Sequence, residues 1–337
     1  MRVLITGGAG FIGCNLARHL ASRGHQVHVL DSLARPGSER NLAWLRETVG
    51  AALTFTQADV RDAAAVTAAA AGADAIFHFA AQVAVTSSVV DPVYDFEVNA
   101  RGTLNVLEAA RRHGSAVFYT STNKVYGGME DVPIVELPTR YAYADLPWGI
   151  SEQQPLDFHS PYGCSKGAAD QYVRDYARIY GLRTVVFRMS CIYGERQFGN
   201  EDQGWVAHFL IAAVLGRPIT IYGDGKQVRD LLHVDDLVRA FELAWERLDT
   251  TAGRVYNIGG GPANTLAIWA EFGPLLEELL GRPVPVSYGP WRPGDQRVYI
   301  TDVRRAAAEF GWQPTISARE GVTRLLRWVQ ANRELFT

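Results

Sequence analysis

The chain has 337 residues, a formal net charge of −3 at pH 7, and 47% hydrophobic and 20% charged residues. This is the composition of an ordinary globular protein of one or two domains, and it argues against nucleic-acid or membrane partners, which attract clustered positive charge. Three cysteines without metal-ligand spacing predict reduced thiols and no metal. No apolar run reaches transmembrane length, and the apolar stretch at the start is too short for a signal peptide, so we expect a cytoplasmic protein.

A glycine-rich turn between two short strands opens the chain. The strand Arg2–Thr6 runs directly into Gly7-Gly8-Ala9-Gly10-Phe11-Ile12-Gly13, and a helix follows to Ser22. Glycines at these three spacings suit a tight turn, the close approach of a pyrophosphate and close packing of helix on sheet. The helix amino terminus offers free N–H groups to phosphate. This order of elements predicts a dinucleotide-binding unit.

An acidic residue ends the second strand of this unit. Gln26–Leu30 is the strand and Asp31 follows it. We expect Asp31 to accept hydrogen bonds from the adenosine ribose and to repel a 2′-phosphate, which favours NAD over NADP. Arg35 weakens that preference a little.

Short apolar strands alternate with helices through residue 188. After the first two, strands are expected at Leu53–Gln57, Ala75–Ala80, Ala116–Thr120 and Thr184–Arg188, with helices near 39–48, 62–71, 91–113 and 160–180. Buried strands separated by helices predict an α/β fold with a Rossmann-type, doubly wound parallel sheet. We expect a dinucleotide-binding domain over 1–188.

Beyond residue 188 the pattern changes to short strands mixed with helices. Strands are expected at Ile219–Tyr222, Val255–Ile258 and Val284–Tyr288, and helices near 204–215, 234–247 and 266–280. We expect residues 189–337 to form a smaller α/β substrate lobe, although parts of this segment could cross back to the first domain. We expect the ligand cleft between the two lobes.

Tyr162 and Lys166 are the strongest candidates for catalysis. Ser160 suits a helix N-cap and Pro161 a first helical residue, so a spacing of four places phenol and ammonium on one helical face. A nearby cation would lower the pKa of the tyrosine and make it a base near neutral pH. Thr122 follows the fifth strand, at the edge of a parallel sheet where ligands bind.

Three motifs in this order resemble the extended short-chain dehydrogenase/reductase family, which comprises nucleotide-sugar epimerases, dehydratases and reductases. They are Gly-x-x-Gly-x-x-Gly at Gly7–Gly13, Ser-Thr-x-x-Val-Tyr-Gly at Ser121–Gly127 and Tyr-x-x-x-Lys at Tyr162–Lys166. Further matching runs at Gly223–Asp230, His233–Asp236 and Asn257–Gly260 extend the resemblance over essentially the whole chain.

The resemblance implies roles for individual residues. Tyr162 would be the base, Lys166 would bind the nicotinamide ribose and lower the tyrosine pKa, and Thr122 would be the catalytic Ser/Thr. The implied NAD-binding residues are Gly7, Gly10, Phe11, Ile12, Gly13, Asp31, Ser32, Arg35, Asp59, Val60, Phe79, Ala80, Ala81, Gln82 and Asn99, together with Tyr162 and Lys166. The implied substrate-binding residues are Gln82, Thr122, Asn123, Gly204, Trp205, Arg229 and Arg292.

Two of these assignments have a simpler reading beside them. The guanidinium groups of Arg229 and Arg292 would hold the substrate diphosphate, because their planar fork meets phosphate bidentately. Each could instead form an ordinary surface ion pair. Asn99 could equally pin the backbone.

Two positions and four longer runs narrow the set of reactions that the family resemblance allows. Sugar 4,6-dehydratases of this family carry Asp-Glu after the catalytic Thr, and this chain has Asn123-Lys124, which cannot perform acid–base elimination of water. The runs Thr122–Gly127, Asp157–Tyr172, Asp202–Val206 and Gly225–Asp230 resemble the epimerases that act on CDP-tyvelose or CDP-paratose at carbon 2. Departures at Tyr141–Ser151 and Met189–Cys191 leave a CDP-glucose-type hexose open.

Inversion at carbon 2 requires redox chemistry. That carbon has no adjacent carbonyl in a glycosyl phosphate, so its C–H is not acidic. Transient oxidation to a keto sugar, with hydride returned to the opposite face, removes the difficulty and regenerates NAD. A UDP-hexose 4-epimerase or a reductase of the same family is the alternative, and a non-catalytic NAD sensor is a distant one, since a sensor needs neither Thr122, Tyr162 nor Lys166. We expect a homo-oligomer, as is common among similar enzymes.

Overall fold

A seven-stranded parallel sheet forms the centre of the computed structural model, which describes residues 1–292 and 295–336. The strands are β1 (Arg2–Thr6), β2 (Gln26–Asp31), β3 (Leu53–Gln57), β4 (Ala75–His78), β5 (Ala116–Thr122), β8 (Thr184–Met189) and β13 (Arg254–Ile258). Their order is β13-β8-β5-β4-β1-β2-β3, and every neighbouring pair is parallel. The expected doubly wound α/β fold is confirmed.

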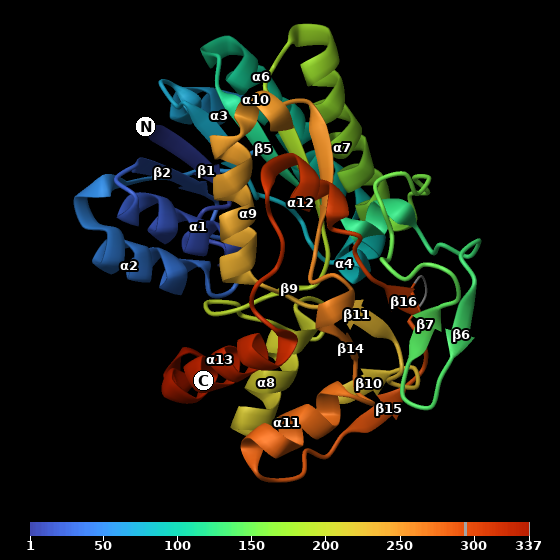
Figure 1. Cartoon of the computed structure of the whole chain (residues 1–337). Helices are drawn as coiled ribbons and strands as arrows, with labels where there is room; N and C mark the ends of the chain where they lie inside the picture. Colours follow the sequence, from blue (N-terminus) through green and yellow to red (C-terminus); the bar gives the residue numbers. More distant parts are fainter. Residues whose placement is uncertain (293–294, 337) are drawn as a thin grey trace.

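Helices cover both faces of this sheet (Figure 1). One face carries α1 (Phe11–Ser22), α2 (Ser38–Val49) and α9 (Val234–Glu246), and the other carries α3 (Ala63–Ala70), α6 (Gly102–His113) and α7 (Ser160–Tyr180). Because side chains alternate along a strand, Val3 and Ile5 pack toward α1, while Leu4 packs toward α3 and α6. Burial on both faces explains why the central strands β1, β4 and β8 are rich in apolar residues, whereas the edge strand β3 is partly exposed and carries polar residues.

A second lobe packs beside the sheet with a core of its own (Figure 1). Its helices are α8 (Trp205–Leu215), α11 (Phe272–Leu280) and α13 (Ala318–Ala331). Its strands pair as β10 (Thr220–Tyr222) with β15 (Ser287–Gly289), and as β11 (Val228–Asp230) between β14 (Thr265–Ala267) and β16 (Val298–Tyr299). Two smaller pairs are β9 (Ile192–Tyr193) with β12 (Leu232–His233), and the hairpin β6 (Ile134–Glu136) with β7 (Tyr141–Tyr143). The short helices are α4 (Val85–Val90), α5 (Pro92–Phe96), α10 (Leu248–Thr251) and α12 (Arg304–Phe310).

The sheet continues past residue 188, where the sequence placed the start of the second lobe. β13 pairs in parallel with β8, and α9 packs on α1. Pairing satisfies the free edge of β8 and buries Tyr256 and Ile258 completely. The strand predicted at Val255–Ile258 exists, but it belongs to the first sheet, so the chain crosses between the lobes.

Two predicted helices are interrupted. The segment 91–113 contains a π-helical turn, Glu97–Arg101, between α5 and α6, and the segment 266–280 begins with strand β14. The π turn holds Asn99, whose side chain bonds to other segments of the chain, and single π turns are frequent at functional sites. Pairing with β11 accounts for β14.

A buried ion pair ties α7 to the sheet. Asp170 in α7 accepts two hydrogen bonds from Arg188 in β8, at 2.9 and 3.0 Å, and the side chains are 0% and 3% exposed. Arg188 also donates to the hydroxyl of Tyr126 at 3.1 Å, and that hydroxyl donates to Asn257 in β13 at 2.6 Å. The network joins α7, β8, β13 and the turn after β5.

We predict that Asp170→Asn lowers the free energy of unfolding by about 3–5 kcal/mol, because the charge of Arg188 would stay buried without its counter-ion. Urea denaturation followed by circular dichroism measures the loss. Glu97→Ala, in the exposed pair with Arg101, is the control and should cost less than about 1 kcal/mol. Equal losses in the two variants would contradict a special role for the buried pair.

Candidate active site

A cavity of about 450 Å³ lies where the strand order reverses, at the carboxyl ends of β1 and β4. The chain passes from β1 toward β2 on one side and from β4 toward β5 on the other, so the loops after β1 and β4 diverge and leave a crevice. Predicted site residues that line it are Gly7, Gly10, Phe11, Ile12, Gly13, Asp31, Ser32, Arg35, Asp59, Val60, Phe79, Ala80, Ala81, Thr122, Asn123, Tyr162, Lys166, Gly204 and Trp205. The cavity therefore joins the dinucleotide-binding turn to the proposed catalytic residues.

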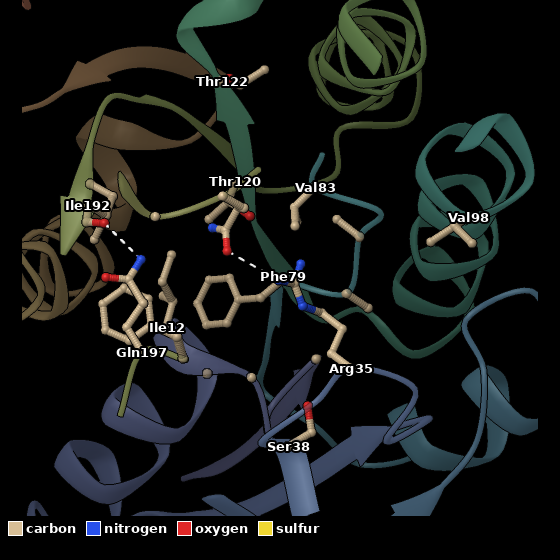
Figure 2. A pocket seen from close by; sticks show the side chains of 18 of the residues that line it. Ile12, Arg35, Ser38, Phe79, Val83, Val98, Thr120, Thr122, Ile192 and Gln197 are labelled. Atoms are coloured by element: carbon tan, nitrogen blue, oxygen red, sulfur yellow. Dashed lines mark hydrogen bonds between the residues drawn. The ribbon is translucent and has the colours of Figure 1, made fainter. Parts of the chain in front are cut away.

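Figure 2 shows the arrangement of the walls. Phe79 and Arg35 point into the middle of the cavity, with Ile12 and Gln197 on one side and Val83 on the other. Thr122 lies toward one end and Ser38 toward the other. The long shape suits an extended ligand with an apolar middle wall.

The first turn needs glycine at two places. Gly7 has a φ of +69°, and a Cβ there would lie 2.6 Å from the backbone nitrogen of Ala80. A Cβ on Gly13 would lie 2.3 Å from the carbonyl oxygen of Gly7. Glycine thus lets β1, α1 and the end of β4 approach one another, which leaves the start of α1 open to a phosphate.

Asp31 is fixed at the end of β2. Its carboxylate accepts hydrogen bonds from the amides of Ala9 at 3.0 Å and Leu33 at 2.8 Å. Burial raises the pKa of this carboxyl, and the amide bonds and Arg35 act against that rise. The group is buried but lines the cavity, as binding of a ribose diol requires.

The Arg35 side chain connects the first domain to the second lobe. It donates to the amide oxygen of Gln203 at 3.1 Å, and its charge acts on both Asp31 and Tyr162. A guanidinium beside the glycine turn suits the negative charge of a dinucleotide pyrophosphate.

Tyr162 and Thr122 face each other across the sheet edge. The helix α7 begins at Ser160, so His159 holds the N-cap position expected for the serine, and the Ser160 hydroxyl accepts a hydrogen bond from the Gly163 amide at 3.2 Å within the first turn. Burial raises the pKa of Tyr162 to about 12, and a hydrogen bond with the Thr122 hydroxyl acts in the opposite direction. The sequence-based expectation of a lowered tyrosine pKa is wrong for the protein alone, because burial outweighs the nearby charges.

Lys166 lies in the same cavity but points elsewhere. Its Nζ donates to the carbonyl of Thr120 at 2.6 Å and lies 4.4 Å from the centre of the Tyr119 ring. Burial lowers the pKa of Lys166 to about 7. The ammonium is thus held toward β5, where its charge does not offset the burial of the phenol.

Four predicted site residues lie outside the cavity lining, namely Gln82, Asn99, Arg229 and Arg292. Asn99 holds the backbone of Gln82, accepting from its amide at 2.9 Å and donating to its carbonyl at 3.1 Å. Arg229 donates to Asp295 at 2.7 Å, and Arg292 donates to the carbonyl of Glu201 at 3.1 Å. The pinning role for Asn99 and the ion-pair reading for Arg229 agree with these contacts, and diphosphate binding by the two arginines stays a prediction.

Sequence reasoning missed part of the second wall. Segment 189–206 contributes Met189, Cys191, Ile192, Gln197 and Gln203. Met189 ends β8, and the rule that ligands gather at carboxyl ends of parallel strands could have identified it. Gln203 lies in the run Asp202–Val206, which the family resemblance includes. Ile192 lies in β9, and Cys191 and Gln197 lie outside the runs that carry the resemblance.

Comparison with known proteins places this site in a family. Residues 3–259 match the model of the NAD dependent epimerase/dehydratase family. The chain belongs to this family. It is 44% identical to a CDP-paratose 2-epimerase from Salmonella typhi, over 98% of this chain and 100% of that protein. As expected from the resemblance, the protein is an NAD-dependent enzyme of nucleotide-sugar metabolism.

Solved structures of the family share the whole fold. A UDP-glucose 4-epimerase from Thermotoga maritima, solved with UDP-glucose, has a TM-score of 0.84 at 30% identity and covers 99% of this chain and 100% of its own. A dTDP-glucose 4,6-dehydratase from Streptomyces venezuelae, solved with NAD, has a TM-score of 0.85 at 32% identity, covering 99% and 98%. One fold therefore carries several reactions, and the site must distinguish them.

None of the helices within 1–292 and 295–336 combines the length and apolar character that a membrane span needs. The same residues contain no cluster of His, Cys, Asp or Glu that could hold a metal ion.

We predict that the nucleotide released by denaturing the purified protein is mainly NAD, because the Asp31 carboxylate would repel the 2′-phosphate of NADP. Mass spectrometry identifies it. In Asp31→Asn, which removes the charge and keeps the side-chain shape, affinity for NADP should rise relative to NAD. Mainly NADP from the unaltered protein would contradict this role of Asp31.

Proposed function

We propose that the protein inverts carbon 2 of a CDP-linked hexose, of the CDP-paratose/CDP-tyvelose or CDP-glucose type. The full-length similarity to a CDP-paratose 2-epimerase is the observation that carries this proposal. Asn123 and Lys124 add to it, because neither side chain can act as the carboxyl pair of a dehydratase.

The chain's own residues account for the proton transfers. Thr122 and Tyr162 present two hydroxyls at one end of the cavity, where a sugar hydroxyl could bond to both. Tyr162 takes the proton of the carbon 2 hydroxyl as that carbon becomes a ketone, and returns it when the alcohol re-forms on the other face. When bound, NAD supplies the hydride acceptor and donor, and a positive charge beside the phenol.

Positive charge is needed because a phenol with a pKa of about 12 keeps its proton at neutral pH. Lys166 follows Tyr162 by one helical turn and is the cationic side chain nearest to it in the sequence. Contact of its ammonium with the phenol side of the cavity, in exchange for the Thr120 carbonyl, would bring the tyrosine toward the range of a working base.

The cavity walls must allow the keto sugar to present both faces. The second wall comes from a loop, 194–204, that the Arg35–Gln203 hydrogen bond connects to the first domain. We propose that this wall, with Gly204 and Trp205, encloses the sugar and excludes water during turnover. A homo-oligomer and a cytoplasmic location accord with the family's usual form and remain part of the proposal.

We predict that Tyr162→Phe reduces turnover of the CDP-hexose on the order of a hundredfold to ten-thousandfold, since it removes the general base and keeps the ring. Bound NAD, measured by its release, should be retained. Tyr180→Phe is the matched control, because that tyrosine lies on the same helix with its side chain exposed to solvent. Activity within about threefold of the unaltered enzyme would remove Tyr162 from the role of base.

We predict that turnover in heavy water gives product inverted at carbon 2 with its original hydrogen, because a returned hydride never exchanges with solvent. NMR of the product reads both the configuration and the isotope. Deuterium at carbon 2 would contradict hydride return. Inversion at carbon 4 of a UDP-hexose, in a parallel panel of CDP-, UDP-, GDP- and dTDP-hexoses, would assign the enzyme to the 4-epimerases instead.

A further inference from the structure

Lys124 is a cation of the cavity that the proposed chemistry has not used. It lies two residues after Thr122, in the turn Asn123–Tyr126, and its backbone amide donates to the Thr122 hydroxyl at 3.2 Å. Its side chain lines the cavity. Among the residues the structure describes, no hydrogen bond or ion pair engages its ammonium.

Other cations on the cavity wall have protein partners. Lys166 bonds to the Thr120 carbonyl, Arg35 bonds to Gln203, and the guanidinium of Arg196 lies 4.3 Å from the centre of the Trp44 ring. Among the cavity cations and the partners within residues 1–292 and 295–336, Lys124 is the one whose charged group is left available to a ligand.

The charges around Lys124 leave an excess of positive charge. Arg229 stands nearby, and the carboxylate of Asp295 already accepts from Arg229 at 2.7 Å. Cys191 is the other titratable group that acts on the ammonium, and burial holds its thiol pKa above the ordinary value. Burial and the charge of Arg229 together lower the pKa of Lys124 to about 8. Two cations share one carboxylate, which is an arrangement that an anion would stabilise.

The reaction places an anion close to the reacting carbon. In a nucleotide sugar the phosphate is attached through carbon 1, so carbon 2 is only a few bonds from the phosphorus. At carbon 4, on the far side of the ring, the phosphate is remote. A cation in the turn that follows Thr122, with its charge toward Arg229, Asp295 and Cys191 rather than toward the phenol, therefore fits a phosphate that lies a few bonds from carbon 2.

We propose that the Lys124 ammonium binds the sugar-linked phosphate of the substrate while Thr122 and Tyr162 engage the carbon 2 hydroxyl. This inference rests on the proposed function and identifies the residue that aligns carbon 2 with the base. Asn123 cannot take this role, because its amide donates to Gln296 at 3.1 Å. A carboxylate at position 124 would repel the phosphate and pair with Arg229 instead.

The first test separates the phosphate contact from other binding. Lys124→Met keeps the length of the side chain and removes the charge. We expect it to weaken binding of CDP-hexose by about 10- to 100-fold, as loss of a charge-assisted hydrogen bond does, and to leave cytidine binding and NAD content unchanged. Lys226→Met is the control, because Lys226 pairs with Glu136 at 2.7 Å outside the cavity. Calorimetric titration gives each affinity.

The second test uses the pH dependence of kcat/KM, which a lysine with a merely structural role would not alter. In the free enzyme the ammonium is protonated below its pKa of about 8, so kcat/KM should fall as pH rises through that value. Lys124→Arg keeps its proton at all these pH values and should extend the plateau to higher pH. Bound phosphate favours the ammonium, so the fall in kcat should lie at higher pH than the fall in kcat/KM.

The outcomes are distinct. Unchanged CDP-hexose affinity in Lys124→Met, or an unmoved alkaline fall in Lys124→Arg, overturns this inference while leaving the proposed function intact, and would assign the fall to Lys166. An unaltered enzyme that turns over no CDP-hexose overturns both.

Discussion

The site depends on the buried ion pair between Asp170 and Arg188, which ties the helix that carries the Tyr162 phenol to the central sheet. The pair joins α7, which carries Tyr162 and Lys166, to β8, and through the Tyr126 hydroxyl to the turn that follows Thr122. Removing two charges from water costs several kcal/mol, and only geometry as complete as this bidentate contact returns that cost. The same contact would hold the hydroxyls of Thr122 and Tyr162 in register, which is what a proton transfer over hydrogen-bond distance requires.

Burial affects both proposed catalytic groups in the same way. It raises the pKa of Tyr162 and lowers that of Lys166, because each neutral form is favoured when water is excluded. In the empty cavity the Tyr162 phenol thus keeps its proton and the positive charge of Lys166 is disfavoured, and the site would become reactive when ligands bring charge into it. Such a site suits an enzyme whose substrate and cofactor both carry diphosphates, since an empty cavity holds no ionised base to react with other molecules.

Solved structures named as a 4-epimerase and as a 4,6-dehydratase share the fold of this chain, so the fold alone does not set the reaction, and side chains around the site must distinguish one reaction from another. Positions 123 and 124 directly follow Thr122 at the end of β5, and both residues line the cavity. An asparagine whose amide donates to Gln296 and a lysine leave no carboxyl at these two positions to expel water. The second lobe supplies the opposite wall, and variation in its loops would change which sugar fits.

The sequence alone determined the parallel sheet, the glycine turn, the position of Asp31 at the end of the second strand and the start of the Tyr–Lys helix. These features depend on short-range rules, such as the φ value that Gly7 needs or the hydrogen bond that Ser160 accepts in the first turn of α7. Tertiary structure decided the rest. Only folding placed β13 beside β8, turned Lys166 toward Thr120 and paired Arg229 with Asp295. The direction of each pKa shift likewise depends on burial and on charges distant in sequence, which spacing along a chain does not encode.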